Sequence, residues 1–198
     1  LHGIEIDLQR LPSEGTNEYW KTGMAAINEV ITHKLKDAVA DGTVQHVSVF
    51  AFARLPLLVY LGSRLDDTYG VELYQRHRST DAWAWPNTDA PTPRFEVTTE
   101  PAIDSPASSP AVLILNVSGT VHPDELPDDL RGLNRHVLAP VGGTQPGVDV
   151  INSPEAVSAF RHAVRSLLSA LEVSDKVMPV LHVIGALPIA AAVALGQT

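Results

Sequence analysis

One short pattern occurs twice in this chain, near its middle and again at its end. Segment 47–62 reads VSVFAFARLPLLVYLG and segment 181–196 reads LHVIGALPIAAAVALG. Each has an apolar stretch, a corner containing proline, and an apolar run that closes on Leu-Gly. Valine, phenylalanine and isoleucine at period two indicate a strand, and the closing glycine is typical of a helix C-cap. We therefore expect a strand followed by a short helix in both places.

A longer helix is predicted before each copy. Over residues 20–40 apolar side chains recur on one face, and Asp41-Gly42 ends the pattern. The counterpart opens at Ser153-Pro154-Glu155, which supplies a cap, a proline at the first helical position and an early acid. Further strands are predicted at 3–8, 71–76 and 111–117.

Strands that alternate with helices and are continuously apolar indicate parallel sheets flanked by helices. The predicted fold is α/β: two fused Rossmann-like units with mainly parallel sheets, related by the internal repeat. We assign residues 1–100 to the first half and 101–198 to the second, whose C-terminal end is expected to be incomplete. Six of the 15 prolines lie between Ser79 and Ala111, so a surface crossover is predicted there.

Composition excludes several classes of function. The 198 residues include 14 Lys and Arg against 23 Asp and Glu, a net charge of −9, which argues against a surface that coats DNA or an anionic membrane. Without cysteine there is no disulfide, no cysteine-ligated zinc and no thiol nucleophile. Residues 177–196 lack charged side chains, but two prolines and many alanines favour a buried strand and helix over a membrane span.

Ligands of doubly wound sheets bind outside the carboxyl ends of the strands. Arginine forks bind phosphate oxygens, and arginine and tryptophan faces stack on bases, so a nucleotide site is predicted at these ends. Arg54 starts a helix, where a cation is unfavourable unless an anion compensates it. The candidate residues at or just beyond predicted strand ends are Arg10, Arg54, Leu55, Tyr74, Gln75, Arg76, His77, Arg78, Trp83, Trp85, Ser118, Gly119, Thr120, Ala186, Leu187 and Pro188.

Structural explanations exist for the same residues. Arg76 and Arg78 also fit solvated strand ends, Trp83 and Trp85 fit anchors for the crossover, and 118–120 fits a plain turn. The sequence contains no GxGxxG, Walker A or GxSxG motif, and its eight histidines are scattered. We therefore predict no catalytic residue, no metal site and no cofactor in this chain.

The strand and corner HVSVFAFARLPLLVYLG, the following VELYQRHR with DAWAWP, and the closing LHVIGALPIAAAVALG resemble the SAVED domain of bacterial antiviral defence. The resemblance runs from Ile4 to Gly196. It departs from the family at Arg54, where proline is frequent, and at Gln197, where a basic residue is usual.

The resemblance implies a sensor of a cyclic di- or oligonucleotide second messenger, related to the CRISPR-associated Rossmann-fold sensors. It implies that binding drives homo-oligomerisation and switches on a fused effector outside this chain, with an HNH-type DNA endonuclease favoured, in cytoplasmic antiphage (CBASS) defence. No membrane and no direct nucleic acid partner is expected. Two other hypotheses stay open: an enzyme that acts on a nucleotide, and a purely structural oligomerisation domain.

Overall fold

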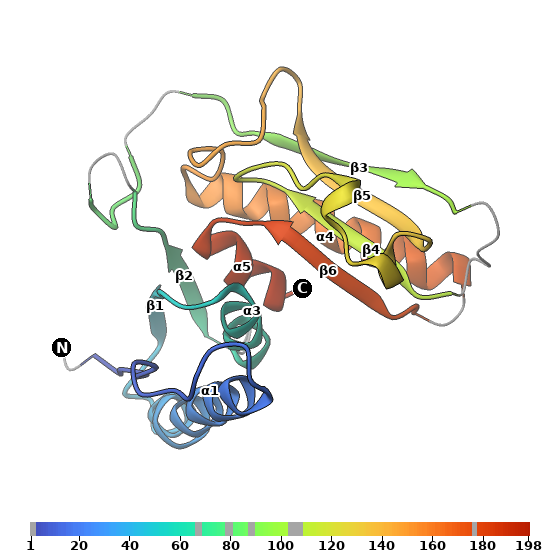
Figure 1. The fold of residues 1–198 in the computed structure, drawn as a ribbon. Helices are drawn as coiled ribbons and strands as arrows, with labels where there is room; N and C mark the ends of the chain where they lie inside the picture. Colours follow the sequence, from blue (N-terminus) through green and yellow to red (C-terminus); the bar gives the residue numbers. More distant parts are fainter. Residues whose placement is uncertain (1–2, 66–68, 78–80, 87–89, 103–108, 176–177) are drawn as a thin grey trace. The chain divides into compact units, whose positions relative to one another are not determined.

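The computed structural model describes residues 3–65, 69–77, 81–86, 90–102, 109–175 and 178–198. The chain divides into two compact units (Figure 1). The first unit is Leu1–Ala84 together with Ala192–Thr198, and the second is Trp85–Ala191.

The first unit begins with the predicted amphipathic helix. Helix α1 (Asn17–Val30) continues through one turn of π-helix, η1 (Ile31–Leu35), into α2 (Lys36–Ala40). The Tyr19 N–H donates to the Thr16 hydroxyl over 3.2 Å, which caps the start of α1. The buried face carries Gly23, Ile27, Ile31 and Leu35 in the spacing of a helix, which confirms the predicted pattern.

Two parallel strands and the helix between them complete the first unit. Strand β1 (His46–Phe50) leads through α3 (Leu55–Arg64) into β2 (Gly70–Tyr74). The register pairs His46 with Gly70 and Phe50 with Tyr74, so the carboxyl ends of the two strands are neighbours. The strand predicted over 71–76 is thus confirmed with an earlier start and an earlier end.

Two sequence predictions for this unit are wrong. Residues 3–8 form no strand, because nothing in the described part of the chain pairs with them; the Gln9 N–H instead donates to Asp7 Oδ1 over 2.8 Å in a local turn. Gly62 is not a C-cap, since α3 continues to Arg64. A Cβ at Gly62 would collide with the backbone of Val193, so glycine allows a close approach there.

The second unit is a four-stranded sheet in the order β3-β5-β4-β6. Strand β4 (Ala111–Asn116), one of its two inner strands, is buried at every position, as expected for a largely apolar strand covered on both faces. Strands β5 (Asn134–Val141) and β6 (Leu181–Ala186) run parallel to β4, and β3 (Arg94–Glu100) runs antiparallel to β5. The predicted strand 111–117 is confirmed.

Each face of this sheet has its own cover. Helix α4 (Pro154–Asp175) runs along one face (Figure 1), where the Phe160 and Phe95 rings meet edge to face with centroids 5.8 Å apart. Two single turns, η2 (Pro123–Glu125) and η3 (Asp128–Leu130), cover the other. Leu126 and Leu130 from these turns cluster with Val112 and Ile114 of β4. The Ala156 N–H donates to Ser153 Oγ over 3.2 Å, which confirms the predicted cap of α4.

The end of the chain forms strand β6 and then helix α5 (Ile189–Gly196), as the repeat predicts. Residues 190–194 are at most 1% exposed. No helix in the described ranges is long and apolar enough to cross a membrane. The α/β fold class with mainly parallel strands is confirmed. Strands β3 and β5 are not predicted by the sequence patterns, and β3 lies inside the proline-rich stretch for which a surface crossover is predicted.

Candidate ligand-binding site

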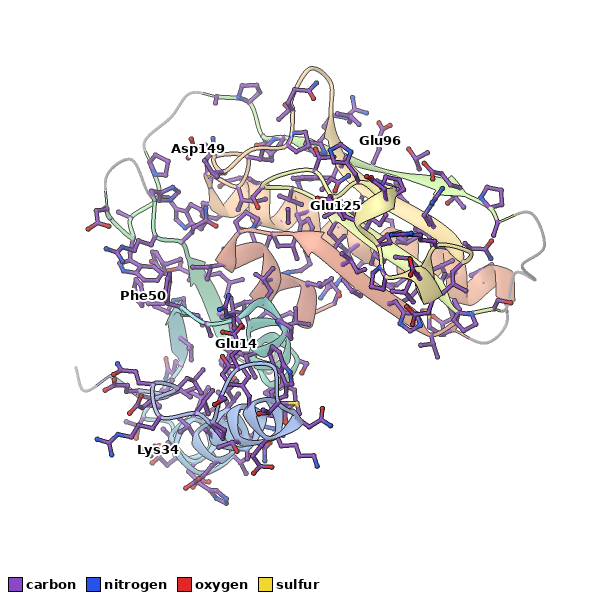
Figure 2. All side chains as sticks on the ribbon, viewed as in Figure 1. Glu14, Lys34, Phe50, Glu96, Glu125 and Asp149 are labelled. Carbon is purple, nitrogen blue, oxygen red and sulfur yellow. The ribbon has the colours of Figure 1, made fainter. Side chains whose placement is uncertain are left out.

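Three aromatic rings meet at the carboxyl ends of β1 and β2. Phe50 and Tyr74 end these two strands and stand in register, so their rings stack with centroids 4.6 Å apart and planes 14° from parallel. The Trp83 ring contacts Phe50 edge to face at 5.6 Å. Phe50 keeps 55% of its surface exposed and is labelled at the strand end in Figure 2. The rings thus form an open aromatic platform (Phe50, Tyr74 and Trp83).

Trp83 reaches this platform because the chain reverses directly after β2. The His77 N–H donates to the Ala82 carbonyl over 2.8 Å, and the Asp81 N–H donates to the His77 carbonyl over the same distance. Asp81 has φ +54°, a left-handed conformation that a residue other than glycine adopts at a cost. These backbone hydrogen bonds of His77 with Asp81 and Ala82 therefore position the indole of Trp83 just beyond them.

The residues after β2 alternate in orientation. Gln75 and His77 are buried, with 5% and 4% of their surface exposed. Arg76 between them is exposed and places its guanidinium 2.5 Å from Asp81 Oδ1. Arg78, the fourth residue of the predicted cluster, lies outside the described residues. Of the described residues in this run, only Arg76 presents its charged group to solvent.

Arg54, like Arg76, is paired with an acidic side chain. Arg54 is the N-cap residue of α3, and its Nη2 lies 2.5 Å from Glu14 Oε2. Both side chains are at least half exposed, and Glu14 is labelled in Figure 2. Glu14 supplies the negative charge that a cation at a helix start requires. An anionic ligand at Arg54 or Arg76 would therefore exchange with a carboxylate.

Two polar side chains, His46 of β1 and Glu72 of β2, flank the aromatic platform on the same face of the two strands and form a polar column. The Tyr74 O–H donates to Glu72 Oε2 over 2.9 Å, and His46 Nε2 lies 3.4 Å from the same oxygen. The hydrogen bond to Glu72 raises the pKa of Tyr74, with smaller contributions from desolvation and from the negative charge of Glu72. The Tyr74 phenol therefore stays a hydrogen-bond donor to a higher pH than a free tyrosine.

The other predicted residues of the first unit lie elsewhere. Arg10 is exposed and follows a segment that is not a strand, so it is not at a strand end as predicted. Leu55 is the first residue of α3 and is half-buried.

In the second unit, the predicted residues after β4 and β6 do lie together. The Ser118 N–H donates to the Ala186 carbonyl over 2.8 Å, and a Cβ at Gly119 would lie 3.4 Å from the Ala186 Cβ. Thr120 is exposed, Leu187 is half-buried and Pro188 is buried just before α5. Trp85 belongs to this unit as well and is half-buried.

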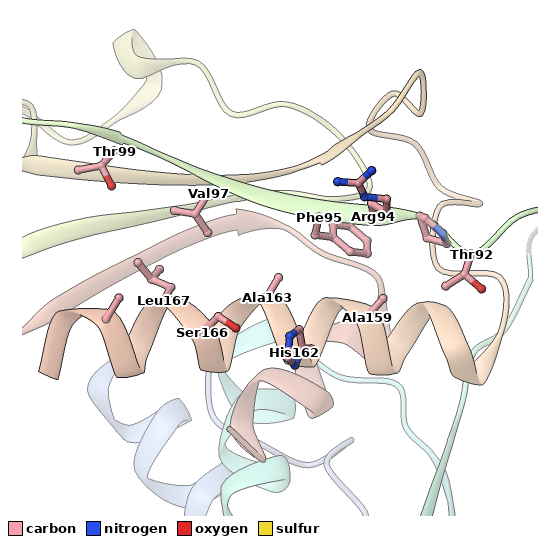
Figure 3. Close-up of a pocket in the computed structure, with 12 residues that line it drawn as sticks. Thr92, Arg94, Phe95, Val97, Thr99, Ala159, His162, Ala163, Ser166 and Leu167 are labelled. Carbon is pink, nitrogen blue, oxygen red and sulfur yellow. The ribbon is translucent and has the colours of Figure 1, made fainter. Parts of the chain in front are cut away.

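A separate groove runs between α4 and β3 in the second unit. It has a volume of about 660 Å³ and is lined by the small or apolar side chains of one face of α4 together with Phe95 and Val97 (Figure 3). His162 and Arg94 are the titratable side chains on its wall. None of the residues predicted from sequence lies in this groove.

Phe50, Glu14 and Asp81 are not among the residues predicted from the sequence. Strict alternation in HVSVF places Phe50 on the same face as His46 and Ser48, and this signal was available. The two acids carried no local signal, because Glu14 is 40 residues from its arginine and Asp81 depends on the reversal of the chain. Among the described residues, no group of three or more His, Asp or Glu side chains is arranged to hold a metal ion.

Two α/β units, with parallel strands whose carboxyl ends carry polar and aromatic residues, make this chain a Rossmann-like α/β protein. A comparison with protein families matches residues 27–198 to SAVED, the SMODS-associated and fused to various effectors sensor domain. The match covers most of the chain, so the chain belongs to the SAVED family. The resemblance drawn from its motifs is confirmed.

Solved structures with a similar fold include the SAVED/CARF-domain containing receptor Cap4 of Acinetobacter baumannii. The form with the cyclic trinucleotide 2'3'3'-cAAA has 15% identity and a TM-score of 0.60, over 93% of this chain and 39% of the receptor. The form with 3'3'3'-cAAA has 15% identity and a TM-score of 0.57 over the same shares. A third Cap4 structure has 17% identity and a TM-score of 0.57, over 93% of this chain and 37% of the receptor. A search of curated proteins found no match to this chain.

Proposed function

We propose that this domain binds a cyclic di- or oligonucleotide second messenger at the carboxyl ends of β1 and β2. The observation that carries the proposal is the exposed stack of Phe50 on Tyr74, with Trp83 against it, in a chain of a sensor family. Stacking on aromatic side chains is a common way to hold a base whatever its identity, because every base has a flat π-face. Cap4, a receptor of similar fold, is described with cyclic trinucleotides.

Arg54 and Arg76 are proposed as the phosphate contacts. Guanidinium groups bind phosphate oxygens through paired, charge-assisted hydrogen bonds. Both side chains are exposed, and each is held on the framework of the unit, one at the start of α3 and one just after β2. The remaining predicted contacts stay predictions: Arg10, Leu55, Gln75, His77, Arg78, Trp85, Ser118, Gly119, Thr120, Ala186, Leu187 and Pro188.

The wider role extends beyond the chain itself. The chain covers 39% of the length of the Cap4 receptor with 2'3'3'-cAAA. We propose that ligand binding favours homo-oligomerisation, which activates an effector fused to the domain, with a DNA endonuclease favoured, in cytoplasmic antiphage defence. The halves 1–100 and 101–198 stay a prediction as the two Rossmann-like parts of this sensor.

Thermal unfolding with a panel of cyclic di- and trinucleotides tests the binding step. A ligand at 100 times its dissociation constant stabilises the folded state by about 2.7 kcal/mol, which raises the midpoint by several degrees. Arg76→Ala should reduce the shift. Arg94→Ala is the matched control, because Arg94 is also an exposed arginine paired with an acid, but on β3. No shift with any member of the panel would reject the proposal.

A further inference from the structure

The polar column beside the aromatic platform suggests how a bound base could be identified. Glu72 stands two residues before Tyr74 on β2, so its side chain points to the same face of the sheet. Ser48 and Glu72 are register partners, as are Phe50 and Tyr74. A base that stacks on the platform would therefore have its edge near Glu72.

The Glu72 carboxylate is anchored but still available. The Tyr74 O–H donates to its Oε2, and His46 Nε2 lies 3.4 Å from that oxygen. A carboxylate has about four acceptor positions on two oxygens, so these neighbours leave free acceptor capacity. The Glu72 side chain is 59% exposed, which keeps this capacity open to a ligand.

We propose that Glu72 is a specificity-determining residue that selects bases bearing an amino group. This inference rests on the proposed binding of a cyclic nucleotide. An ionised carboxylate only accepts hydrogen bonds, so it matches the amino group of adenine, guanine or cytosine. Uracil instead offers one N–H between two carbonyl oxygens, and those oxygens would face the negative charge of Glu72.

Tyr74 acts on this selection as a positioning residue. Its ring belongs to the platform, and its O–H holds Glu72 Oε2 at 2.9 Å. Tyr74→Phe keeps the ring and removes the hydrogen bond, so stacking should persist while base selection weakens. The two contributions of this one side chain are thereby separable.

Calorimetric titration of the whole chain with cyclic triadenylate and cyclic triuridylate tests the inference. The wild-type chain should prefer the adenine ligand by about 5- to 100-fold, the discrimination expected from well-placed hydrogen bonds to a base edge. Glu72→Gln should reduce the preference to less than about threefold, because a side-chain amide both donates and accepts. Tyr74→Phe should fall between them.

Glu96→Gln is the matched control, because Glu96 is also an exposed glutamate paired with a basic side chain, on β3. It should leave the preference unchanged. Equal affinity of the wild-type chain for both ligands, or an undiminished preference in Glu72→Gln, overturns the role of Glu72 while leaving nucleotide binding intact. If the wild-type chain binds neither ligand and no other cyclic nucleotide, both the proposed function and this inference fall.

Discussion

Gly62 and Gly196, the glycines that close the two copies of the repeated segment, lie against each other. A Cβ built on Gly62 would stand 3.0 Å from the Gly196 Cα, and one built on Gly196 would stand 2.9 Å from the Gly62 Cα. The nearest atoms on each side are backbone atoms of the facing helix, Val193 for Gly62 and Val59 for Gly196. Equivalent positions of the repeat thus let α3 and the end of α5 pack backbone to backbone.

Gly62→Ala should destabilise the chain by about 1–3 kcal/mol, because the added methyl group can be accommodated only if the α5 backbone moves. The better helix propensity of alanine offsets part of this cost. Urea unfolding followed by circular dichroism measures the change. Gly132→Ala is the control, since nothing lies within 4 Å of a Cβ there. Equal stability of the two variants would contradict the close approach.

Phe160→Ala should cost about 3–5 kcal/mol of unfolding free energy, as expected for the removal of a large buried aromatic side chain. Phe160 is fully buried between α4 and the sheet and meets Phe95 edge to face. Val173→Ala on the same helix is the comparison, because Val173 is 83% exposed. The second variant should unfold within about 0.5 kcal/mol of the wild-type chain.

Asp81→Asn should strengthen the binding of an anionic ligand at Arg76 by about two- to sixfold, because an exposed ion pair of ordinary strength occupies the arginine for most of the time. Asparagine tolerates the left-handed backbone of Asp81, so the backbone hydrogen bonds that join His77 to Asp81 and Ala82 should persist. Titration with the cyclic nucleotide measures the change. Asp128→Asn removes a similar pair with Arg131 in the second unit and should have no effect. An equal gain in affinity in both variants would reflect the change in net charge and would contradict a specific release of Arg76.

Glu72→Gln should lower the pKa of Tyr74 toward that of a free tyrosine. Glu72 accepts the hydrogen bond that stabilises the neutral phenol, so its negative charge opposes ionisation of that group. Phenolate absorbance followed through an alkaline titration measures the shift, and Tyr74→Phe identifies the component among the four tyrosines. An identical titration curve in Glu72→Gln would mean that the hydrogen bond is absent in solution.

Much of the fold could be predicted because local patterns agree with the final packing. Helix α1 and its continuation follow from the apolar face of 20–40, and β6 with α5 follows from the repeat. Strand β3 is hard to predict from the sequence, because its few apolar residues alternate with charged and polar ones inside a proline-rich stretch. Its stability comes from pairing with β5, more than 30 residues away. Residues 3–8 have a similar alternation without such a partner, and they form no strand.

The sequence predicts the position of the candidate site in the fold, but it does not predict the contacts of the individual residues there. The rule that ligands bind at the ends of parallel strands led to Tyr74, Arg76 and Trp83. Burial of Gln75 and His77 follows from the alternation that continues beyond β2, which a count of residues past a strand end does not reveal. The pairing of Arg54 with Glu14 is a tertiary contact across 40 residues. Such a contact leaves no trace in either local segment.

The binding of a cyclic trinucleotide by Phe50→Ala, measured by isothermal titration beside the wild-type chain, tests the central claim most directly. Phe50 is 55% exposed, so Phe50→Ala should fold normally. Val183→Ala is the control, because it removes another exposed side chain, from β6, and should also fold normally. Loss of one stacking ring should weaken binding by about 5- to 100-fold in Phe50→Ala and leave Val183→Ala unchanged. Equal affinity in all three proteins would place the ligand elsewhere and contradict the account.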